Sequence, residues 1–300
     1  MADILRRHVL LLTVAAVLFS TVPVSNSIPF IVLHGLGDKC SGGVSDYATL
    51  LSNLSGSPGS CLEIGHGGHG ARDSWFMPLT LQAKLACNIV KNMTELSQGY
   101  NIVAESQGNM VARGLIEFCD DAPPVINYVS LGGPHAGVAA PPNKWCHAGP
   151  FCAIANFFLK IGVYNDFVQD HIAPSGFVKI PDEKTKYLEH SKYLPKLNNE
   201  RPDQRNSTFK DRFASLHNLV LVMFLNDTIL VPRETSWFGF IVDGGVDTIA
   251  VAQLTALYIE DWIGLKALDD AGKVKFVSVP GDHLMIGFDD TVKYVVPYLK

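Results

Sequence analysis

The stretch YNIVAESQG, residues 100–108, decides the fold that this chain is expected to adopt. Its first five residues predict a short buried strand, and an apolar helical pattern over residues 108–119 begins two positions after Ser106. A serine held in so tight a turn between strand and helix is a nucleophile elbow, which needs very small residues two positions before and after it. Ala104 and Gly108 occupy these positions. Taken alone, the string also fits a serine that merely caps a helix.

Two later loops hold the partners that a nucleophilic serine needs. The most apolar strand, residues 219–225, runs into a loop with Asp227, and the strand predicted over residues 274–279 runs into a loop with His283. A serine hydroxyl is a weak nucleophile at neutral pH, so it needs a base and an acid that orients the base. The order serine, aspartate, histidine, each after a strand, is that of the α/β-hydrolases. Ser106, Asp227 and His283 are therefore the expected catalytic residues.

Acyl transfer also needs backbone N–H donors for the oxyanion that forms on the carbonyl. We expect one donor at Gln107, directly after the nucleophile, and the other at Leu36, in the loop HGLG (residues 34–37) after the first strand. Asp282 is a rival to Asp227 for the role of the acid. Because it adjoins the histidine in sequence, it is expected to face solvent instead.

Four further histidines lie in or beside glycine-rich loops. His34 is expected to be structural. His66 and His69 in the string GHGGHG resemble a metal clip, but no third ligand is near in sequence, so we expect an exposed loop and no metal. His135 follows a strand and either lines the site or is structural. The chemistry needs no cofactor.

Strands and helices alternate along the chain. Apolar runs predict strands over residues 29–33, 100–104, 125–131, 219–225 and 274–279. Helices are predicted over residues 47–54, 78–96, 108–119 and 290–299. The second helix has its apolar residues near the i, i+3, i+4 spacing of one helix face, at Leu81, Leu85, Ile89, Met93 and Leu96. This alternation predicts an α/β fold with a mostly parallel sheet and helices on both faces.

One segment interrupts the alternation. Between residues 131 and 219 lie 87 residues without a clear strand, whereas the usual connection has about 4–6 residues. Within this segment, residues 151–168 are dense in aromatic and aliphatic side chains, which must be buried or presented to a ligand. We interpret about 132–218 as a helical cap inserted into a single domain that spans residues 28–300.

The composition is that of a globular protein with a leader. Of 300 residues, 47% are hydrophobic and 18% are charged, which excludes a disordered chain, and the net charge of −5 excludes the basic footprint of a nucleic-acid binder. Residues 1–27 have the layout of a secretory signal peptide, with Arg6, Arg7 and an apolar run over residues 9–19. That run is too short to span a bilayer. We expect a soluble mature protein without a membrane span.

Cysteines and sequons agree with a secreted protein. The chain has six cysteines, and an oxidising compartment would pair them in one of about fifteen ways. We favour the pairs Cys146–Cys152, Cys87–Cys119 and Cys40–Cys61. The first encloses a short Gly/Pro loop, the second joins two helices that flank one strand, and the third follows by elimination. Glycosylation sequons occur at Asn53, Asn92, Asn206 and Asn226.

Residues 28–300 resemble the palmitoyl-protein thioesterases, lysosomal lipid hydrolases of the α/β-hydrolase superfamily. The matching strings are HGLGD (34–38), LEIG (62–65), QGYN (98–101), SQG (106–108), FLND (224–227), WFGF (237–240), LYIEDWIGLKALDDAG (257–272) and GDHL (281–284). The resemblance implies hydrolysis of fatty acyl thioesters on cysteines of lipid-modified proteins, and it assigns the same three catalytic residues and two oxyanion donors. The elbow departs from the family at Ala104 and Asn109, and a cysteine pair of the family is Cys40-Ser41 here, which favours Cys61 as the partner.

The resemblance also implies that the insertion forms a lobe that holds the acyl chain. Candidates for its groove are Phe157, Phe158, Ile161, Val163, Phe167, Trp237 and Phe240. Expected substrates are palmitoylated proteins or peptides and acyl thioesters, turned over by a monomer in the lysosome or vacuole, or outside the cell. A neutral lipase or carboxylesterase would use the same triad on oxyesters. A non-catalytic lipid-binding relative would usually have lost a triad residue, and none is missing.

Overall fold

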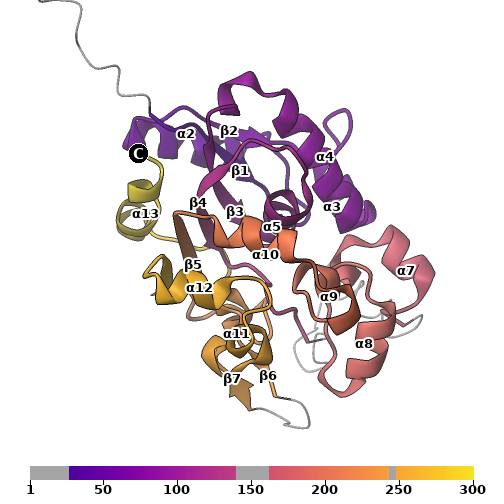
Figure 1. Cartoon of the computed structure of the whole chain (residues 1–300). Helices are drawn as coiled ribbons and strands as arrows, with labels where there is room; N and C mark the ends of the chain where they lie inside the picture. Colours follow the sequence, from indigo (N-terminus) through magenta and orange to yellow (C-terminus); the bar gives the residue numbers. More distant parts are fainter. Residues whose placement is uncertain (1–26, 140–161, 243–247) are drawn as a thin grey trace, which may run out of the picture.

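A computed structural model describes residues 27–139, 162–242 and 248–300. Six parallel strands form a twisted sheet in the order β2-β1-β3-β4-β5-β8 (Figure 1). Their bounds are β1 (Phe30–Leu33), β2 (Gly59–Leu62), β3 (Tyr100–Glu105), β4 (Val125–Leu131), β5 (Asn218–Phe224) and β8 (Val274–Val279). A separate antiparallel hairpin pairs β6 (Phe240–Ile241) with β7 (Ile249–Ala250). The parallel sheet confirms the predicted α/β-hydrolase fold.

Helices connect the strands and cover the sheet. The α-helices are α2 (Gly43–Ser55), α3 (Gly70–Phe76), α4 (Leu79–Asn92), α5 (Gly108–Phe118), α7 (Asp166–His171), α8 (Lys184–His190), α9 (Leu194–Leu197), α10 (Ser207–Ala214), α11 (Ala256–Ile259), α12 (Leu265–Asp270) and α13 (Phe288–Tyr294). Short 3₁₀ helices are η1 (Thr94–Leu96), η2 (Ala173–Phe177), η3 (Pro181–Glu183), η4 (Pro202–Gln204), η5 (Arg233–Trp237), η6 (Ala252–Leu254) and η7 (Val296–Tyr298).

The two faces of the sheet belong to two separate cores. Along β1, Ile31 and Leu33 pack into one core, and Phe30 and Val32 pack into the other. Helices α4, α5, α10 and α12 contribute to the first core, whereas α2 and η7 contribute to the second. Because successive side chains point to opposite faces and both faces are covered, both sets must be apolar. This explains why the strands are nearly continuous apolar runs in the sequence.

Helix α4 buries a different face from the predicted one. Its buried apolar residues are Leu79, Ala83, Ala86 and Val90, whereas Leu81 is 52% exposed. Of the predicted face, Ile89 and Met93 are partly buried against the first core, and Leu96 is buried beyond the end of the helix. A Cβ atom added at Gly114 of α5 would lie 2.7 Å from the Cβ of Ala83. The small residues therefore let α4 approach α5 closely, and this close packing outweighs the burial of a larger leucine.

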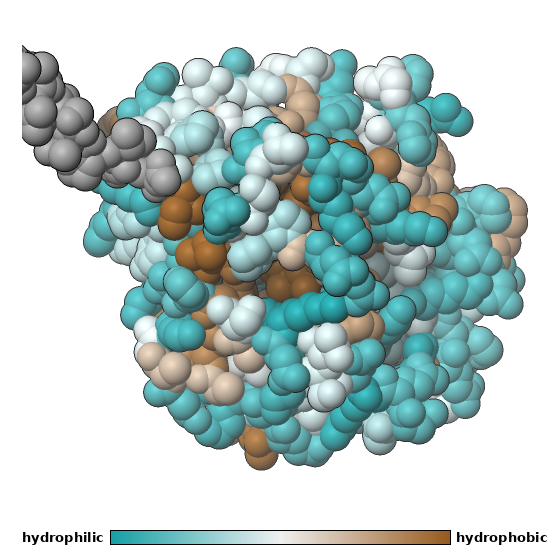
Figure 2. Space-filling model, turned by 45° about the horizontal axis from the view of Figure 1, so that its top comes forward, coloured by the Kyte–Doolittle hydropathy of each residue, from teal (hydrophilic) through white to brown (hydrophobic). Residues whose placement is uncertain are grey.

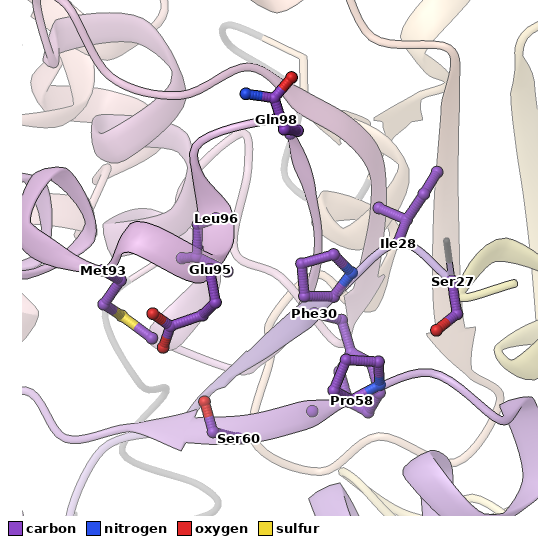
Figure 3. A pocket seen from close by; sticks show the side chains of 12 residues that line it. Ser27, Ile28, Phe30, Pro58, Ser60, Met93, Glu95, Leu96 and Gln98 are labelled. Carbon is purple, nitrogen blue, oxygen red and sulfur yellow. The ribbon is translucent and has the colours of Figure 1, made fainter. Parts of the chain in front are cut away.

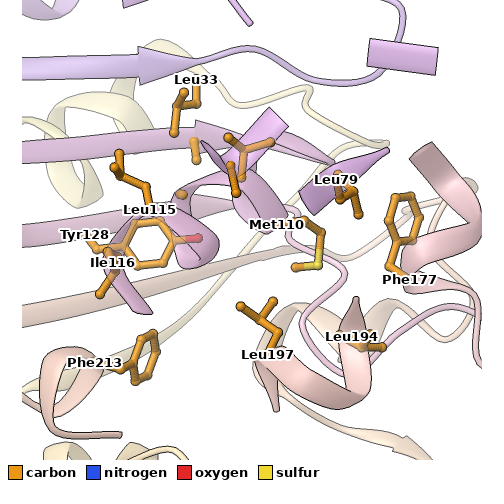
Figure 4. Close-up of a cluster of buried hydrophobic side chains, with 14 of the residues drawn as sticks. Leu33, Leu79, Met110, Leu115, Ile116, Tyr128, Phe177, Leu194, Leu197 and Phe213 are labelled. Carbon is orange, nitrogen blue, oxygen red and sulfur yellow. The ribbon is translucent and has the colours of Figure 1, made fainter. Parts of the chain in front are cut away.

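The described part of residues 132–218 consists of short helices and turns on one side of the sheet (Figure 1). Phe177, Leu194 and Leu197 of this insertion lie beside Leu79 and Met110 in the first core (Figure 4). The insertion is thus anchored to the sheet domain by apolar packing on α4 and α5. Some predicted features lie outside the described residues: the apolar stretch 151–161 with Phe157, Phe158 and Ile161, the cysteines Cys146 and Cys152, and residues 1–26.

Two disulfides form as predicted. Cys87 in α4 is bonded to Cys119 after α5, and Cys40 after the first glycine loop is bonded to Cys61 in β2; each pair has Cα atoms 5.5 Å apart. The first links two helices of one layer, and the second ties the edge strand to the loop after β1. Strand β2 itself was not predicted, because its sequence GSCL is short and its side chains are only partly buried. Within the described ranges, no helix has the length and apolar character needed to cross a bilayer.

The Cys87–Cys119 disulfide should contribute measurably to stability. It joins residues 32 positions apart, and in the chain-entropy description a loop of that length contributes about 3–4 kcal/mol to the free energy of unfolding. We expect the double substitution Cys87→Ser, Cys119→Ser to lower this free energy by that amount in guanidinium unfolding followed by circular dichroism. A loss below about 1 kcal/mol would contradict the prediction.

Candidate active site

Ser106 sits in a strained turn at the carboxyl end of β3. Its backbone has φ of 48°, in the left-handed region that residues with a side chain rarely adopt. The N–H of Ser106 donates to the carbonyl oxygen of Leu131 at 2.9 Å, which ties the turn to the end of β4. Helix α5 starts two residues later, so the hydroxyl stands at the edge of the sheet where the parallel strands end.

The structure brings the three predicted catalytic side chains together. Nε2 of His283 lies 2.8 Å from Oγ of Ser106, and Nδ1 of His283 lies 2.7 Å from Oδ2 of Asp227. Oδ1 of Asp227 accepts the N–H groups of Ile229 and Leu230, each at 2.9 Å, and its side chain is fully buried. A carboxylate can only accept, so Nδ1 carries the proton and Nε2 is free to accept the serine proton.

Asp282 does not compete for the imidazole. Its carboxylate accepts the N–H of His283 at 2.7 Å and the N–H and hydroxyl of Thr228 at 2.8 and 2.9 Å. Burial alone would raise the pKa of Asp282, but these donors hold the pKa below its usual value. Asp282 is partly exposed to solvent, and its carboxylate links the two loops that carry Asp227 and His283.

The glycine loop after β1 lies against the nucleophile. A Cβ atom added at Gly35 would lie 3.3 Å from the Cβ of Ser106, and one at Gly108 would lie 2.6 Å from the carbonyl oxygen of Leu33. The contact at Gly108 leaves no room for a side chain, and the contact at Gly35 is tight enough that Ser106 would have to shift. Among the described residues, no acceptor is bound to the backbone N–H of Leu36 or of Gln107. Both groups thus have the free donor capacity that oxyanion stabilisation requires, and their role remains a proposal.

The other histidines are placed by their contacts. His34 is buried and accepts the N–H of Ile64 on Nε2 at 3.1 Å, so its Nδ1 proton is donated to the carbonyl oxygen of Gly35 at 3.0 Å. Both ring nitrogens hold the glycine loop in place. His66 and His69 are exposed, and the part of the chain that the structure describes contains no cluster of three metal-ligating side chains.

His135 belongs to the interior, not to the site. It is fully buried, its Nε2 lies 2.8 Å from the hydroxyl of Ser130, and its ring stacks on Phe238. Burial, with the positive charge of Arg113 nearby, holds the pKa of His135 well below its usual value. The histidine is therefore neutral and serves the packing behind the sheet edge.

A buried ion pair links the elbow helix to the insertion, and the sequence patterns did not reveal it. Arg113 of α5 pairs with Glu117 at 2.9 Å, and both side chains are fully buried. The guanidinium also donates to Oδ1 of Asn198 at 2.7 Å and to the carbonyl oxygen of Leu197 at 3.1 Å. A charged pair inside an otherwise apolar helix is visible in sequence only as an i, i+4 spacing that is usually found on exposed faces.

The four described candidates for the acyl groove have different surroundings. Val163 and Phe240 are buried, and Phe167 is 59% exposed and stacks on His171. The indole N–H of Trp237 donates to carbonyl oxygens of β5 and β8, at 2.9 and 3.2 Å. Their assignment to an acyl groove stays a prediction.

A cavity of about 640 Å³ lies at the opposite edge of the sheet from the triad (Figure 3). It is lined at the amino ends of the strands, for example by Phe30, Gly59 and Gly99. Figure 2 shows hydrophobic residues gathered on one face of the molecule. Ser27 and Ile28, at the start of the described residues, also line this cavity. Because parallel strands place their two ends at opposite edges, this cavity is separate from the serine site.

Comparisons with known proteins identify the family of the chain. A family described as "Palmitoyl protein thioesterase" matches residues 29–283. The chain belongs to this family. Palmitoyl-protein thioesterase 1 of Caenorhabditis elegans is 35% identical over 267 residues, 87% of this chain and 88% of that protein. Palmitoyl-protein thioesterase 3 of Dictyostelium discoideum is 30% identical over 78% of this chain and 80% of that protein.

The name of a third relative refers to the lysosome. Lysosomal thioesterase PPT2-B of Xenopus laevis is 31% identical over 184 residues, which are 61% of this chain and 62% of that protein. As a member of the palmitoyl protein thioesterase family, the 300-residue chain described here is an enzyme of the thioester hydrolase class.

Glu105, the residue before the nucleophile, should make the stability of this thioesterase depend on pH. Burial, with the negative charge of Asp38 nearby, raises the pKa of Glu105 from 4.5 to about 7. Between pH 4.5 and 7 the folded protein therefore keeps a proton on Glu105 that the unfolded chain has lost. The free energy of unfolding falls with rising pH over this range: the stability linked to the protonated carboxyl is fully present below pH 4.5 and is lost as the pH rises through 7.

We expect Glu105→Gln to leave the free energy of unfolding unchanged at pH 4 and to raise it by about 2–3 kcal/mol at pH 8, because glutamine stays neutral. Urea unfolding at both pH values measures this difference. An equal effect of the substitution at pH 4 and pH 8 would show that Glu105 does not titrate as described.

Proposed function

We propose that this thioesterase hydrolyses long-chain fatty acyl thioesters, palmitoyl thioesters in particular, on cysteines of lipid-modified proteins. The observation that carries the proposal is the hydrogen-bonded chain from Asp227 through His283 to Ser106, in a member of the palmitoyl protein thioesterase family. Serine, imidazole and carboxylate in this order are the machinery of acyl transfer through an acyl-enzyme. All three groups belong to the protein, so the proposed reaction needs no cofactor.

In the acylation step, Oγ of Ser106 attacks the thioester carbonyl while Nε2 of His283 takes the hydroxyl proton. The negative charge that develops on the carbonyl oxygen is stabilised by the N–H groups of Leu36 and Gln107. Collapse of the tetrahedral intermediate breaks the carbon–sulfur bond, and His283 gives its proton to the leaving thiolate. The products are an acyl ester on Ser106 and a free cysteine thiol.

In the deacylation step, water replaces the thiol. Nε2 of His283 takes a proton from the water as its oxygen attacks the ester carbonyl of the acyl-enzyme. The same two N–H groups hold the second oxyanion, and Ser106 leaves with the proton from His283. The fatty acid departs and the enzyme returns to its starting state.

Asp227 keeps the imidazole in the productive state. Its buried carboxylate holds the proton on Nδ1, orients the ring toward the serine and stabilises the imidazolium that forms in both steps. The two backbone donors at Ile229 and Leu230 occupy its other oxygen, so the carboxylate has one orientation.

A long acyl chain would supply much of the binding energy, at about 0.8 kcal/mol for each buried CH₂ group. We place the acyl chain in a groove lined by the insertion lobe, with the candidates Phe157, Phe158, Ile161, Val163 and Phe167, and by Trp237 and Phe240 outside the insertion. Residues 132–218 would then act as the acyl-binding part of one domain, and the enzyme would act as a monomer on palmitoylated proteins or peptides.

We place the enzyme in the secretory pathway, with the lysosome as its destination. The signal-peptide pattern of residues 1–27, the two disulfides and the relative that is named lysosomal support this placement. Asn53, Asn92 and Asn226 are exposed and could carry glycans. Asn206 is only half-exposed and caps α10 by accepting the N–H groups of Thr208 and Phe209.

Turnover of matched substrates tests the proposed reaction. We expect hydrolysis of a palmitoyl thioester on a cysteine peptide, and a loss of at least about 10³-fold in kcat on Ser106→Ala, because the nucleophile is removed. The same peptide with a palmitoyl oxyester on serine, measured in parallel, separates a thioesterase from a lipase or carboxylesterase. Turnover of short oxyesters alone would favour the esterase, and full activity of the serine variant would contradict the mechanism.

The two aspartates provide a second test. Asp227→Asn removes the acceptor that holds the proton on Nδ1 of His283 and should lower kcat about 10⁴-fold. Asp282→Asn is the matched control, because its amide oxygen still accepts backbone N–H groups, and it should lower kcat less than about tenfold. A larger loss for Asp282→Asn than for Asp227→Asn would reverse the assignment of the acid.

A further inference from the structure

The carbonyl oxygen of Ser106 is bound twice by Asn109. It accepts the backbone N–H of Asn109 at 3.0 Å and the side-chain Nδ2 of Asn109 at 2.9 Å. Nδ2 also donates to the carbonyl oxygen of Leu131 at 3.1 Å, and Oδ1 accepts the hydroxyl of Tyr128 at 2.8 Å. Asn109 is fully buried, so this amide has no competing water in reach. The two carbonyl oxygens can only accept, which settles the orientation of the amide.

This contact acts on the peptide unit that contains the proposed oxyanion donor. The carbonyl of Ser106 and the N–H of Gln107 belong to one planar trans peptide, in which the two groups point in opposite directions. A side chain that fixes the carbonyl oxygen therefore also fixes the direction of the N–H. Because Ser106 has φ of 48°, its neighbouring peptide would relax toward a commoner conformation without such a restraint.

We propose that Asn109 is a positioning residue that holds the Ser106–Gln107 peptide plane so that its N–H points at the oxyanion. Tyr128 orients the amide from behind, and the shared contact to Leu131 ties the elbow to the end of β4. Burial raises the pKa of Tyr128, so its hydroxyl stays a donor at every working pH. The inference rests on the proposed function, since it assigns a task within that reaction.

A residue that aims an oxyanion donor should affect the transition state and not the ground state. Asn109→Asp keeps the size of the side chain but replaces the donor by an acceptor that faces two carbonyl oxygens. We expect kcat for a palmitoyl thioester to fall about 10- to 100-fold with KM within twofold. Tyr128→Phe removes the hydroxyl that donates to Oδ1 of Asn109 at 2.8 Å and lies 3.4 Å from the carbonyl oxygen of Asn109. Because the amide of Asn109 itself stays, we expect a smaller loss, about threefold, of the same kind.

Two inhibitors separate positioning from general structure. A palmitoyl trifluoromethyl ketone forms a tetrahedral oxyanion on Ser106, so its inhibition constant should rise by the same factor as kcat falls. A peptide with a hexadecyl thioether on its cysteine has no thioester carbonyl on which an oxyanion could form, so it should bind both variants as tightly as the wild type. Asn127→Asp is the matched control, because Asn127 is also a buried asparagine, but it bonds Asn101 and Tyr298 at the other end of β4. We expect its kcat and ketone inhibition constant to stay within twofold of the wild type.

Folded variants with unchanged kcat and an unchanged inhibition constant for the ketone would overturn the inference. Variants that bind the ketone and the thioether more weakly by the same factor would also overturn it. If Asn109→Asp does not fold, Tyr128→Phe decides between these outcomes. A wild-type protein that turns over no acyl thioester would reject the proposed function and this inference together. An active wild type with unaffected variants would reject this inference alone.

Discussion

The strained turn at Ser106 is the constraint on which the rest of the site depends. A left-handed serine persists only because its surroundings hold it from several sides. The backbone of Gly35 approaches it from the loop after β1, and the carbonyl oxygen of Leu131 accepts its N–H from the end of β4. Gly108 allows α5 to start against the end of β1. Each contact comes from a different element, so the turn exists only when the sheet is assembled.

The parallel sheet supplies these contacts because all its strands end at one edge. The loops after β3, β5 and β8 bring Ser106, Asp227 and His283 within hydrogen-bond distance, although His283 lies 177 positions after Ser106. Both faces of the sheet are packed by helices, so the loops at the edge are the part left free for chemistry. The buried pair of Arg113 and Glu117 then joins the elbow helix to the insertion.

The sequence predicted five of the six strands of the parallel sheet, and it placed Ser106, Asp227 and His283 in loops that the structure brings together, because apolar runs and the spacing of loops are local signals. It failed for β2, whose four residues carry no apolar pattern, and for the β6–β7 hairpin, whose strands have two residues each. It also chose the wrong face of α4, since the contact between Ala83 and Gly114 depends on how closely two helices approach. Asp282 was expected to face solvent without a partner role. Its carboxylate accepts the N–H of Thr228, a residue 54 positions earlier in the chain, and a hydrogen bond over that separation leaves no local sequence signal.

By itself the sequence determined the fold class, the two disulfides within the described residues and the candidates for the reactive side chains. These follow from periodicity, residue chemistry and position relative to strand ends, which a chain carries locally. Only the tertiary structure decided the proton position on His283, the separation of Asp282 from the triad and the hold of Asn109 on the peptide after Ser106. Hydrogen bonds between distant segments have directions and lengths that only an assembled fold defines, because each needs both partners in place.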